Sequence, residues 1–226
     1  MTGRRTEWNQ ARSLYDRLSR RYDLMADASE HAIRERGIRA IGLSQGERVL
    51  EIGYGTGHGL VSLANAVGQT GQVHGVDLSS GMTAVARARI ESAGVRNVTL
   101  TVGDADVLCF RSNVFDAVFM SFTLEVFESA VPNVLAEVRR VLRNGGRLGL
   151  VAMAETGETN PMIDLYHWAH QHWPHLVDCR PIDVASVLQA ARFQTETAAV
   201  SAIWALPVVI AIGVKASVAS PEGPTT

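Results

Sequence analysis

The chain has 226 residues, 46% of them hydrophobic, and carries 21 basic and 23 acidic residues for a formal net charge of −2. This length suits one domain with a substantial core, and the charge balance lacks the basic footprint that nucleic-acid binding requires. The two cysteines, Cys109 and Cys179, lie far apart in neither metal-binding nor redox spacing, so we expect reduced thiols.

Two helices are predicted before the first strand, at about 7–21 and 28–41. The polar start of the chain lacks the apolar run of an export signal, so we expect a cytoplasmic location. Tyr15 and Tyr22 are seven residues apart and share one helix face if that helix is continuous. They either line a binding pocket or pack the helices together.

A buried strand near residue 50 ends abruptly in a glycine-rich turn. Glu51 precedes glycines at alternate positions, Gly53, Gly55 and Gly57, with Tyr54 between the first two. Such glycines allow positive φ and let a ligand approach bare backbone. A helix pattern follows, and its first amides would point at whatever lies on the turn. The pattern indicates a nucleotide-type cofactor, although a glycine turn without a ligand is the plain structural alternative.

The glycine spacing argues against a dinucleotide site, which needs G-x-G-x-x-G. Counted from Gly53, the third glycine position holds His58, and counted from Gly55 it holds Leu60. The pattern here is E-x-G-x-G-x-G instead.

The second predicted strand, 72–76, ends in Asp77 and is followed by Leu78. An acid about twenty residues beyond the glycines can accept two hydrogen bonds from a ribose diol. Asp77 could alternatively cap the next helix, but Ser79 and Ser80 already offer that cap, which favours the ligand role.

Two more strands bring polar residues to the same edge. The strand 98–102 leads into Gly103-Asp104-Ala105, and the almost wholly apolar strand 115–120 is typical of a strand buried on both faces. It ends in Ser121, with Glu125 four residues beyond, at the edge that carries the glycine turn. A helix at 131–142 with apolar residues at helical spacing, a turn, and a strand at 148–153 complete this part of the chain.

An insert at 155–180 precedes the last elements, and a helix is predicted to begin near Pro161. Its aromatic and imidazole side chains recur every three or four residues, at Tyr166, His167, His170 and Trp173. A metal site is the least favoured interpretation because no acid or cysteine completes a ligand set. A packed lid and a substrate-pocket wall stay open.

The apolar run 198–214 is interrupted by Pro207 and is too short for a membrane-spanning helix. We expect two strands instead, at 195–203 and 208–215, joined at residues 205–207. Consecutive strands with a short connection form an antiparallel pair. Residues 217–226 are predicted to be a disordered tail.

The glycine turn, Asp77, the Gly103-Asp104-Ala105 segment and the turn 141–147 together resemble class I S-adenosylmethionine (SAM)-dependent methyltransferases over about 45–154. Asn144 stands where that family usually has proline. The chain is most similar to the ubiquinone/menaquinone-biosynthesis C-methyltransferases and related small-molecule enzymes, whose Y-D-x-x-A-x-x-Y-D opening resembles the segment 15–23.

The resemblance implies an α/β fold with a Rossmann-like, seven-stranded, mostly parallel sheet whose last strand is antiparallel and whose helices cover both faces. It implies one methyltransferase domain, 1–216. Within it we expect four parts: an N-terminal helical lid at 1–44, a SAM-binding core at 45–154, an insert or substrate lid at 155–180, and a helix with a terminal β-hairpin at 181–216.

The cofactor implied is S-adenosyl-L-methionine. The family pattern assigns Asp104 to the adenine amino group, with the Ala105 amide nearby, and Met82 to the adenine face, although core packing is an equal alternative for a methionine in a helix. The full set of predicted cofactor-binding residues is Glu51, Gly53, Tyr54, Gly55, Gly57, Asp77, Leu78, Met82, Asp104, Ala105 and Ser121.

Methyl transfer chiefly requires alignment and exclusion of water, and a general base is needed only when the acceptor must lose a proton. Glu125 ranks first among the candidate catalytic residues, followed by His167, His170 and Tyr22. The sequence does not show which of them faces the methyl group.

The expected partner is a small lipophilic acceptor resembling a quinone precursor. No nucleic-acid contact and no transmembrane segment are expected, while peripheral membrane contact and a dimer stay open. Three alternatives also stay open: a phospholipid or amine N-methyltransferase, a SAM-binding protein of this fold without methyl transfer, and an NAD-dependent oxidoreductase, which His58 and the terminal hairpin disfavour.

Overall fold

The computed structural model describes residues 27–155, 181–203 and 206–216. Several predictions therefore lie outside the described residues. They concern the first helix with Tyr15 and Tyr22, the insert with His167 and His170, and the C-terminal tail.

A seven-stranded sheet in the order β3-β2-β1-β4-β5-β7-β6 forms the centre of the molecule. Its strands are β1 Arg48–Ile52, β2 Gln72–Asp77, β3 Val98–Val102, β4 Phe115–Ser121, β5 Leu142–Met153, β6 Phe193–Ile203 and β7 Leu206–Lys215. Strand β7 runs antiparallel to both neighbours, and the other pairings are parallel. The predicted sheet, with its last strand antiparallel, is confirmed.

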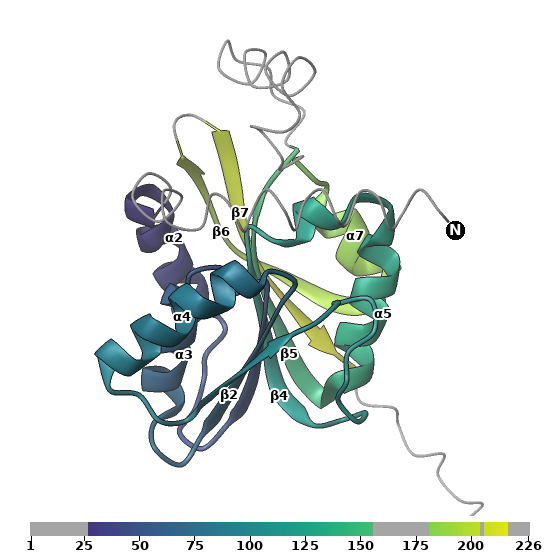
Figure 1. The fold of residues 1–226 in the computed structure, drawn as a ribbon. Helices are drawn as coiled ribbons and strands as arrows, with labels where there is room; N and C mark the ends of the chain where they lie inside the picture. The colour runs from purple at the N-terminus through teal and green to yellow at the C-terminus, as the bar shows by residue number, and fades with distance from the viewer. Residues whose placement is uncertain (1–26, 156–180, 204–205, 217–226) are drawn as a thin grey trace, which may run out of the picture.

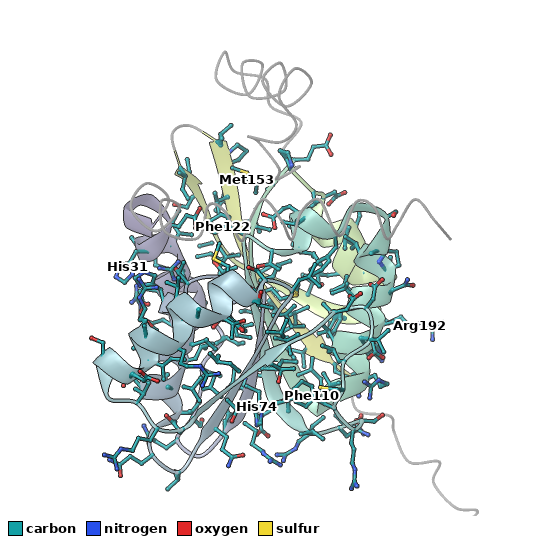
Figure 2. All side chains as sticks on the ribbon, in the orientation of Figure 1. His31, His74, Phe110, Phe122, Met153 and Arg192 are labelled. Atoms are coloured by element: carbon teal, nitrogen blue, oxygen red, sulfur yellow. The ribbon has the colours of Figure 1, made fainter. Side chains whose placement is uncertain are left out.

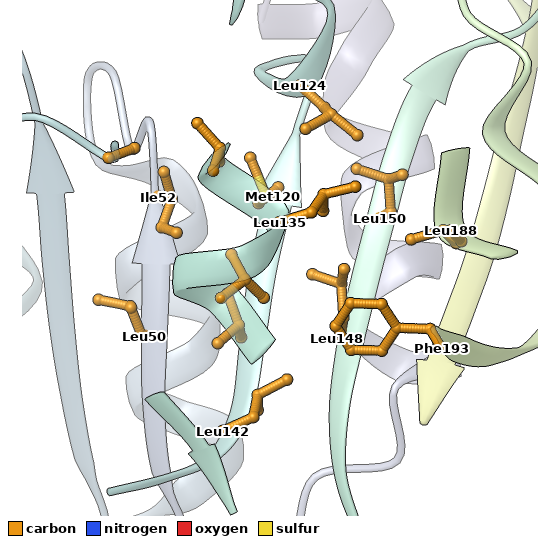
Figure 3. Packing of buried hydrophobic residues seen from close by; sticks show 14 of the residues in the cluster. Leu50, Ile52, Met120, Leu124, Leu135, Leu142, Leu148, Leu150, Leu188 and Phe193 are labelled. Carbon is orange, nitrogen blue, oxygen red and sulfur yellow. The ribbon is translucent and has the colours of Figure 1, made fainter. Parts of the chain in front are cut away.

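Helices cover both faces of this sheet (Figure 1). On one face lie α2 Asp27–Ala40, α3 His58–Val67 and α4 Ser80–Ala93, and on the other α5 Val131–Val141 and α7 Val184–Ala190. A 3₁₀ helix, η1 Leu124–Ala130, connects β4 to α5. Each face has its own hydrophobic cluster, and Figure 3 shows the one between the sheet and α5 and α7.

Strand β1 divides its side chains between the two clusters. Leu50 and Ile52 pack with α5, whereas Val49 packs with α2 and α3. Successive side chains of a strand point to opposite faces, so Glu51 points to the same face as Val49. This alternation places a carboxylate among the helices α2 and α3.

Two boundaries differ from the predictions. Leu142 already pairs with Phe115, and the next pair is Ala117 with Arg147, so the predicted turn is an irregularity inside a longer β5. The terminal strands begin earlier than predicted, and Pro207 lies inside β7, where it pairs with Ala202. In the described part of the chain, no helix is long and apolar enough to cross a membrane.

Candidate functional site

The glycine turn after β1 lies at the edge of the sheet where the parallel strands end. Gly53, Gly55 and Gly57 have φ of 69°, 49° and 85°, a left-handed conformation that side chains with a Cβ rarely adopt. The alternation of glycines in the sequence is therefore required by the backbone of the turn.

Space around these glycines distinguishes their roles. A Cβ on Gly53 would overlap Thr123, and one on Gly57 would lie 2.8 Å from the Cβ of Ala86. Around Gly55, in contrast, the described part of the chain places no heavy atom within 4 Å of such a Cβ, apart from Gly55 and its two chain neighbours. The absence of a side chain at Gly53 and Gly57 thus lets the turn pack closely on Thr123 and Ala86. Gly55 borders a space that a ligand could fill.

Gly59 is a residue of this turn that the sequence reasoning missed. A Cβ there would overlap the Glu51 carboxylate, so the first turn of α3 packs directly on that group. The sequence does contain an indication of this residue, because the alternation of glycines continues from Gly57 to Gly59.

Asp77 ties the end of β2 to the glycine turn. Its Oδ2 accepts the Gly55 amide and its Oδ1 accepts the Ser79 amide, both at 2.8 Å. The side chain of Ser79 caps α4 by accepting the Met82 amide at 3.0 Å, so the capping alternative for Asp77 is wrong. A carboxylate has about four lone-pair sites, so its two oxygens can together accept more than two hydrogen bonds.

Two predicted cofactor residues have buried side chains. The Tyr54 hydroxyl shares a 2.7 Å hydrogen bond with Thr83, and its ring packs beside Gly75 below the turn. Burial raises the pKa of Tyr54 to about 12, so the phenol stays neutral. The side chain of Met82 is also buried, which is the arrangement of the core-packing alternative.

Glu51 is a carboxylate in an unusual position. Only 3% of its surface is exposed, and its Oε2 has no hydrogen-bond partner among the described residues. Burial raises the pKa of Glu51 to about 8, Arg34 on α2 opposes this rise, and Asp77 adds to it. A buried acceptor of this kind suits a cationic ligand group.

The segment after β4 connects the glycine turn with Glu125. Thr123 Oγ1 lies 2.9 Å from the Ser121 carbonyl and 3.3 Å from the Gly53 carbonyl, and it can donate its hydrogen to either one.

Phe122, in the same segment, has φ of 51°, a strained conformation for a residue with a side chain. Phe122 and Met153 mark this end of the sheet in Figure 2. The Ser121 hydroxyl is buried and has no hydrogen-bond partner among the described residues.

Glu125 is 1% exposed at the start of η1. Its Oε1 accepts the Met153 amide at 2.7 Å, while its Oε2 has no partner among the residues that the structure describes. Burial raises the pKa of Glu125 to about 7, the backbone hydrogen bonds of Glu125 and Met153 lower it, and Glu30 raises it. This carboxyl group can hold or release a proton near neutral pH.

The end of β3 carries Asp104 and Ala105 next to Asp77. The Gly103 amide donates to the Asp77 carbonyl at 2.9 Å, and Asp104 Oδ1 accepts the Asp106 amide at 2.8 Å. Ala105 is buried. The predicted residues from the ends of β1, β2, β3 and β4 therefore gather at one edge of the sheet, with the half-buried Leu78 following Asp77.

The predicted residues Tyr22, His167 and His170 cannot be placed at this edge, since they lie outside the described residues. In the described ranges, no group of three or more His, Cys, Asp or Glu side chains could hold a metal ion.

Comparisons with known proteins identify relatives of this chain. A model of the methyltransferase domain family matches residues 49–146. Aklanonic acid methyltransferase DauC from Streptomyces sp. (strain C5) is 33% identical over 159 residues, which are 69% of this chain and 67% of that protein. Demethylmenaquinone methyltransferase from Bacillus cytotoxicus is 32% identical over 139 residues, or 60% of this chain and 58% of that protein.

Among solved structures, a SAM-dependent methyltransferase from Aquifex aeolicus has the same fold, with a TM-score of 0.65. Its sequence is 20% identical, and the match covers 88% of this chain and 98% of that one.

Proposed function

Given that this chain belongs to the class I SAM-dependent methyltransferases, we propose that it transfers the methyl group of SAM to a lipophilic, quinone-like small molecule. The observation that carries this proposal is the set of three buried oxygens without partners among the described residues, at the ends of the adjacent strands β1 and β4. They belong to Glu51, Ser121 and Glu125.

The residues of the site fit SAM group by group. The open space at Gly55 lets the cofactor lie against backbone, and Asp77 beside it has acceptor capacity for a ribose diol. Asp104 follows β3 on the other side of Asp77, where the adenine amino group would find an acceptor. The buried Oε2 of Glu51 suits the α-ammonium group of the methionine end.

SAM supplies a methyl group on a positively charged sulfur, and its transfer to a nucleophile is an in-line displacement. The protein aligns the two reactants and keeps water out, and such positioning can account for roughly 7–11 kcal/mol of a barrier. The segment from Ser121 to Glu125 suits this task because Thr123 fixes it to the glycine turn.

Glu125 is our proposed general base. A phenol or a quinol ring carbon must lose a proton on methylation, and a base works best when its pKa lies near the operating pH. Burial raises the pKa of Glu125 to about 7, and one of its oxygens has no partner in the described part of the chain.

The quinone-like acceptor is supported by the two curated relatives, one named for demethylmenaquinone and the other for aklanonic acid. The chain spans 67% and 58% of the length of these proteins, so the acceptor stays a proposal.

The experiment uses methyl-labelled SAM with three acceptors: reduced demethylmenaquinone, aklanonic acid and phosphatidylethanolamine. We expect label in an organic extract with one of the first two, in step with release of S-adenosylhomocysteine. Label on phosphatidylethanolamine alone would support a phospholipid N-methyltransferase instead. Binding of SAM without transfer to any acceptor in the panel or in a bacterial extract would favour a SAM-binding protein with another role.

A further inference from the structure

The segment between β3 and β4 carries Asp104 and Ala105, the two residues that we assign to adenine. Its first part is a tight turn. Asp104 Oδ1 accepts the Asp106 amide at 2.8 Å, and the Asp104 carbonyl accepts the Val107 amide at 3.3 Å. Asp104 therefore uses one carboxylate oxygen to shape this turn, and the direction of its second oxygen follows from where the turn is held.

Two charged side chains of α5 hold the far end of this turn. Glu137 Oε2 accepts the Leu108 amide at 2.8 Å, and Arg140 donates to the Leu108 carbonyl at 2.9 Å. Arg140 also donates to the Phe110 carbonyl at 2.7 Å. Both backbone polar groups of Leu108, which follows Asp104 by four residues, are thus bound to one helix.

Glu137 and Arg140 also fix each other. Arg140 donates to both carboxylate oxygens of Glu137, from Nε at 2.6 Å and from Nη2 at 2.8 Å. Such a bidentate pair has a specific geometry, so neither side chain turns freely away from the segment. The hydrogen bond from Arg140 lowers the pKa of the Glu137 carboxyl, desolvation opposes this effect, and the Leu108 amide adds to it. Glu137 is therefore charged at neutral pH.

Apolar packing attaches the same segment to α5. The side chains of Ala105 and Leu108 are buried in the hydrophobic cluster that contains Val134 and Val138 of this helix. Phe110 lies at the end of the sheet away from the candidate site (Figure 2). The position of the turn is therefore set by a helix that comes after β4 in the chain, and not by β3 alone.

We propose that the Glu137–Arg140 pair is a positioning device for adenine recognition: it holds the segment after β3 so that the second carboxylate oxygen of Asp104 faces the adenine amino group. This inference rests on the proposed function. A hydrogen bond requires a donor–acceptor distance of about 3 Å and a nearly linear arrangement, so a shift of the turn by about 1 Å would remove it. Glu137 and Arg140 thus act on the cofactor through Asp104.

The test measures binding of S-adenosylhomocysteine and S-inosylhomocysteine to the full chain by titration calorimetry. The second ligand has an oxygen in place of the adenine amino group, so the ratio of the two affinities reports on this one contact. We expect Arg140→Ala to bind S-adenosylhomocysteine about tenfold more weakly, since a hydrogen bond to a charged acceptor is misaligned. Its affinity for S-inosylhomocysteine should stay within about twofold of wild type.

The matched control is Arg139→Ala, which removes the neighbouring arginine of the same helix and its 2.8 Å hydrogen bond to the Arg192 carbonyl. Both affinities of this variant should stay within about twofold of wild type. A double-mutant cycle tests the route through Asp104. In an Asp104→Ala background, Arg140→Ala should change the affinity for S-adenosylhomocysteine by less than about twofold, because the group that it positions is already absent.

Arg140→Lys keeps the charge and a donor for one of the two carbonyls, and it serves if Arg140→Ala does not fold. It should retain part of the preference for S-adenosylhomocysteine. Unchanged affinity for S-adenosylhomocysteine in Arg140→Ala, or equal losses for both ligands, would overturn this inference and leave the proposed function standing. The same holds for a wild-type protein that binds the two ligands equally well. Failure of the wild-type protein to bind SAM or S-adenosylhomocysteine would overturn both.

Discussion

Asp77 at the end of β2 accepts the amide of Gly55, the most open residue of the glycine turn, at 2.8 Å. The carboxylate that we assign to the ribose also holds the backbone on which the cofactor would lie. Its other oxygen accepts the amide of Ser79, the residue that caps α4. One side chain thus fixes the geometry of the turn and the start of the next helix.

Asp77→Ala should weaken SAM binding about thirty-fold, or roughly 2 kcal/mol, because hydrogen bonds to a charged acceptor are lost. The free energy of unfolding should also fall by roughly 1–3 kcal/mol, since two backbone amides lose their acceptor. Calorimetric titration and urea unfolding measure the two effects separately. An unchanged dissociation constant would show that Asp77 is not a cofactor ligand.

Gly55→Ala should separate ligand binding from backbone strain. Alanine at a φ of 49° costs about 1–2 kcal/mol of stability, yet its methyl group has room in the protein itself. Binding of SAM should fall at least tenfold, because the methyl group occupies the open space.

Gly94→Ala is the matched control for Gly55→Ala. Gly94 also has positive φ, 69°, and open space around it, but it ends α4 away from the turn. We expect a similar loss of stability and an unchanged SAM affinity. Equal losses of affinity in the two variants would refute the placement of the cofactor on Gly55.

Glu51 should release a proton when SAM binds. Burial raises its pKa to about 8, so at neutral pH the carboxyl group is mostly protonated, and an ammonium partner would favour the charged form. The affinity for SAM should therefore rise with pH and level off above about pH 8. Calorimetry in buffers with different ionisation enthalpies counts the proton, and Glu51→Gln should abolish its release. Binding without proton release at neutral pH would contradict this role of Glu51.

Glu125→Gln should remove most of the turnover while leaving SAM affinity unchanged. Only the deprotonated carboxylate acts as a base, so the wild-type kcat should rise as the pH passes through about 7, the pKa that burial gives this group. The variant should lack this limb of the pH profile. Unchanged turnover in Glu125→Gln would exclude the residue as the base.

The stability that Glu51 and Glu125 contribute should fall as the pH rises. Folding raises the pKa of Glu51 to about 8 and that of Glu125 to about 7, both from 4.5, so the folded protein retains protons that the unfolded chain releases. Their contribution to the free energy of unfolding is complete below about pH 4.5 and is lost as the pH approaches 8. In urea unfolding, a Glu51→Gln/Glu125→Gln double variant should lose less stability than wild type over this interval. Parallel pH profiles would mean that these carboxyl groups do not titrate as described.

The sequence by itself determined the sheet, the glycine turn and the residues at the ends of β1 to β4. These follow from short-range rules: apolar runs for buried strands, alternate glycines for positive φ, and a short link between antiparallel strands. The carboxyl ends of parallel neighbours meet at one edge, so strand order along the chain is enough to group Glu51, Asp77, Asp104 and Ser121.

Only the tertiary structure decided what surrounds each of these groups. The burial of Glu51 and Glu125, and the pKa values that follow from it, depend on helices that pack over them from distant parts of the chain. The same holds for Arg34, which lies seventeen positions before Glu51 in the sequence and faces it only because α2 packs across β4 and β5. Local spacing sets which way a side chain points along its own strand or helix, whereas desolvation and charge pairing are set by whatever the fold places opposite it.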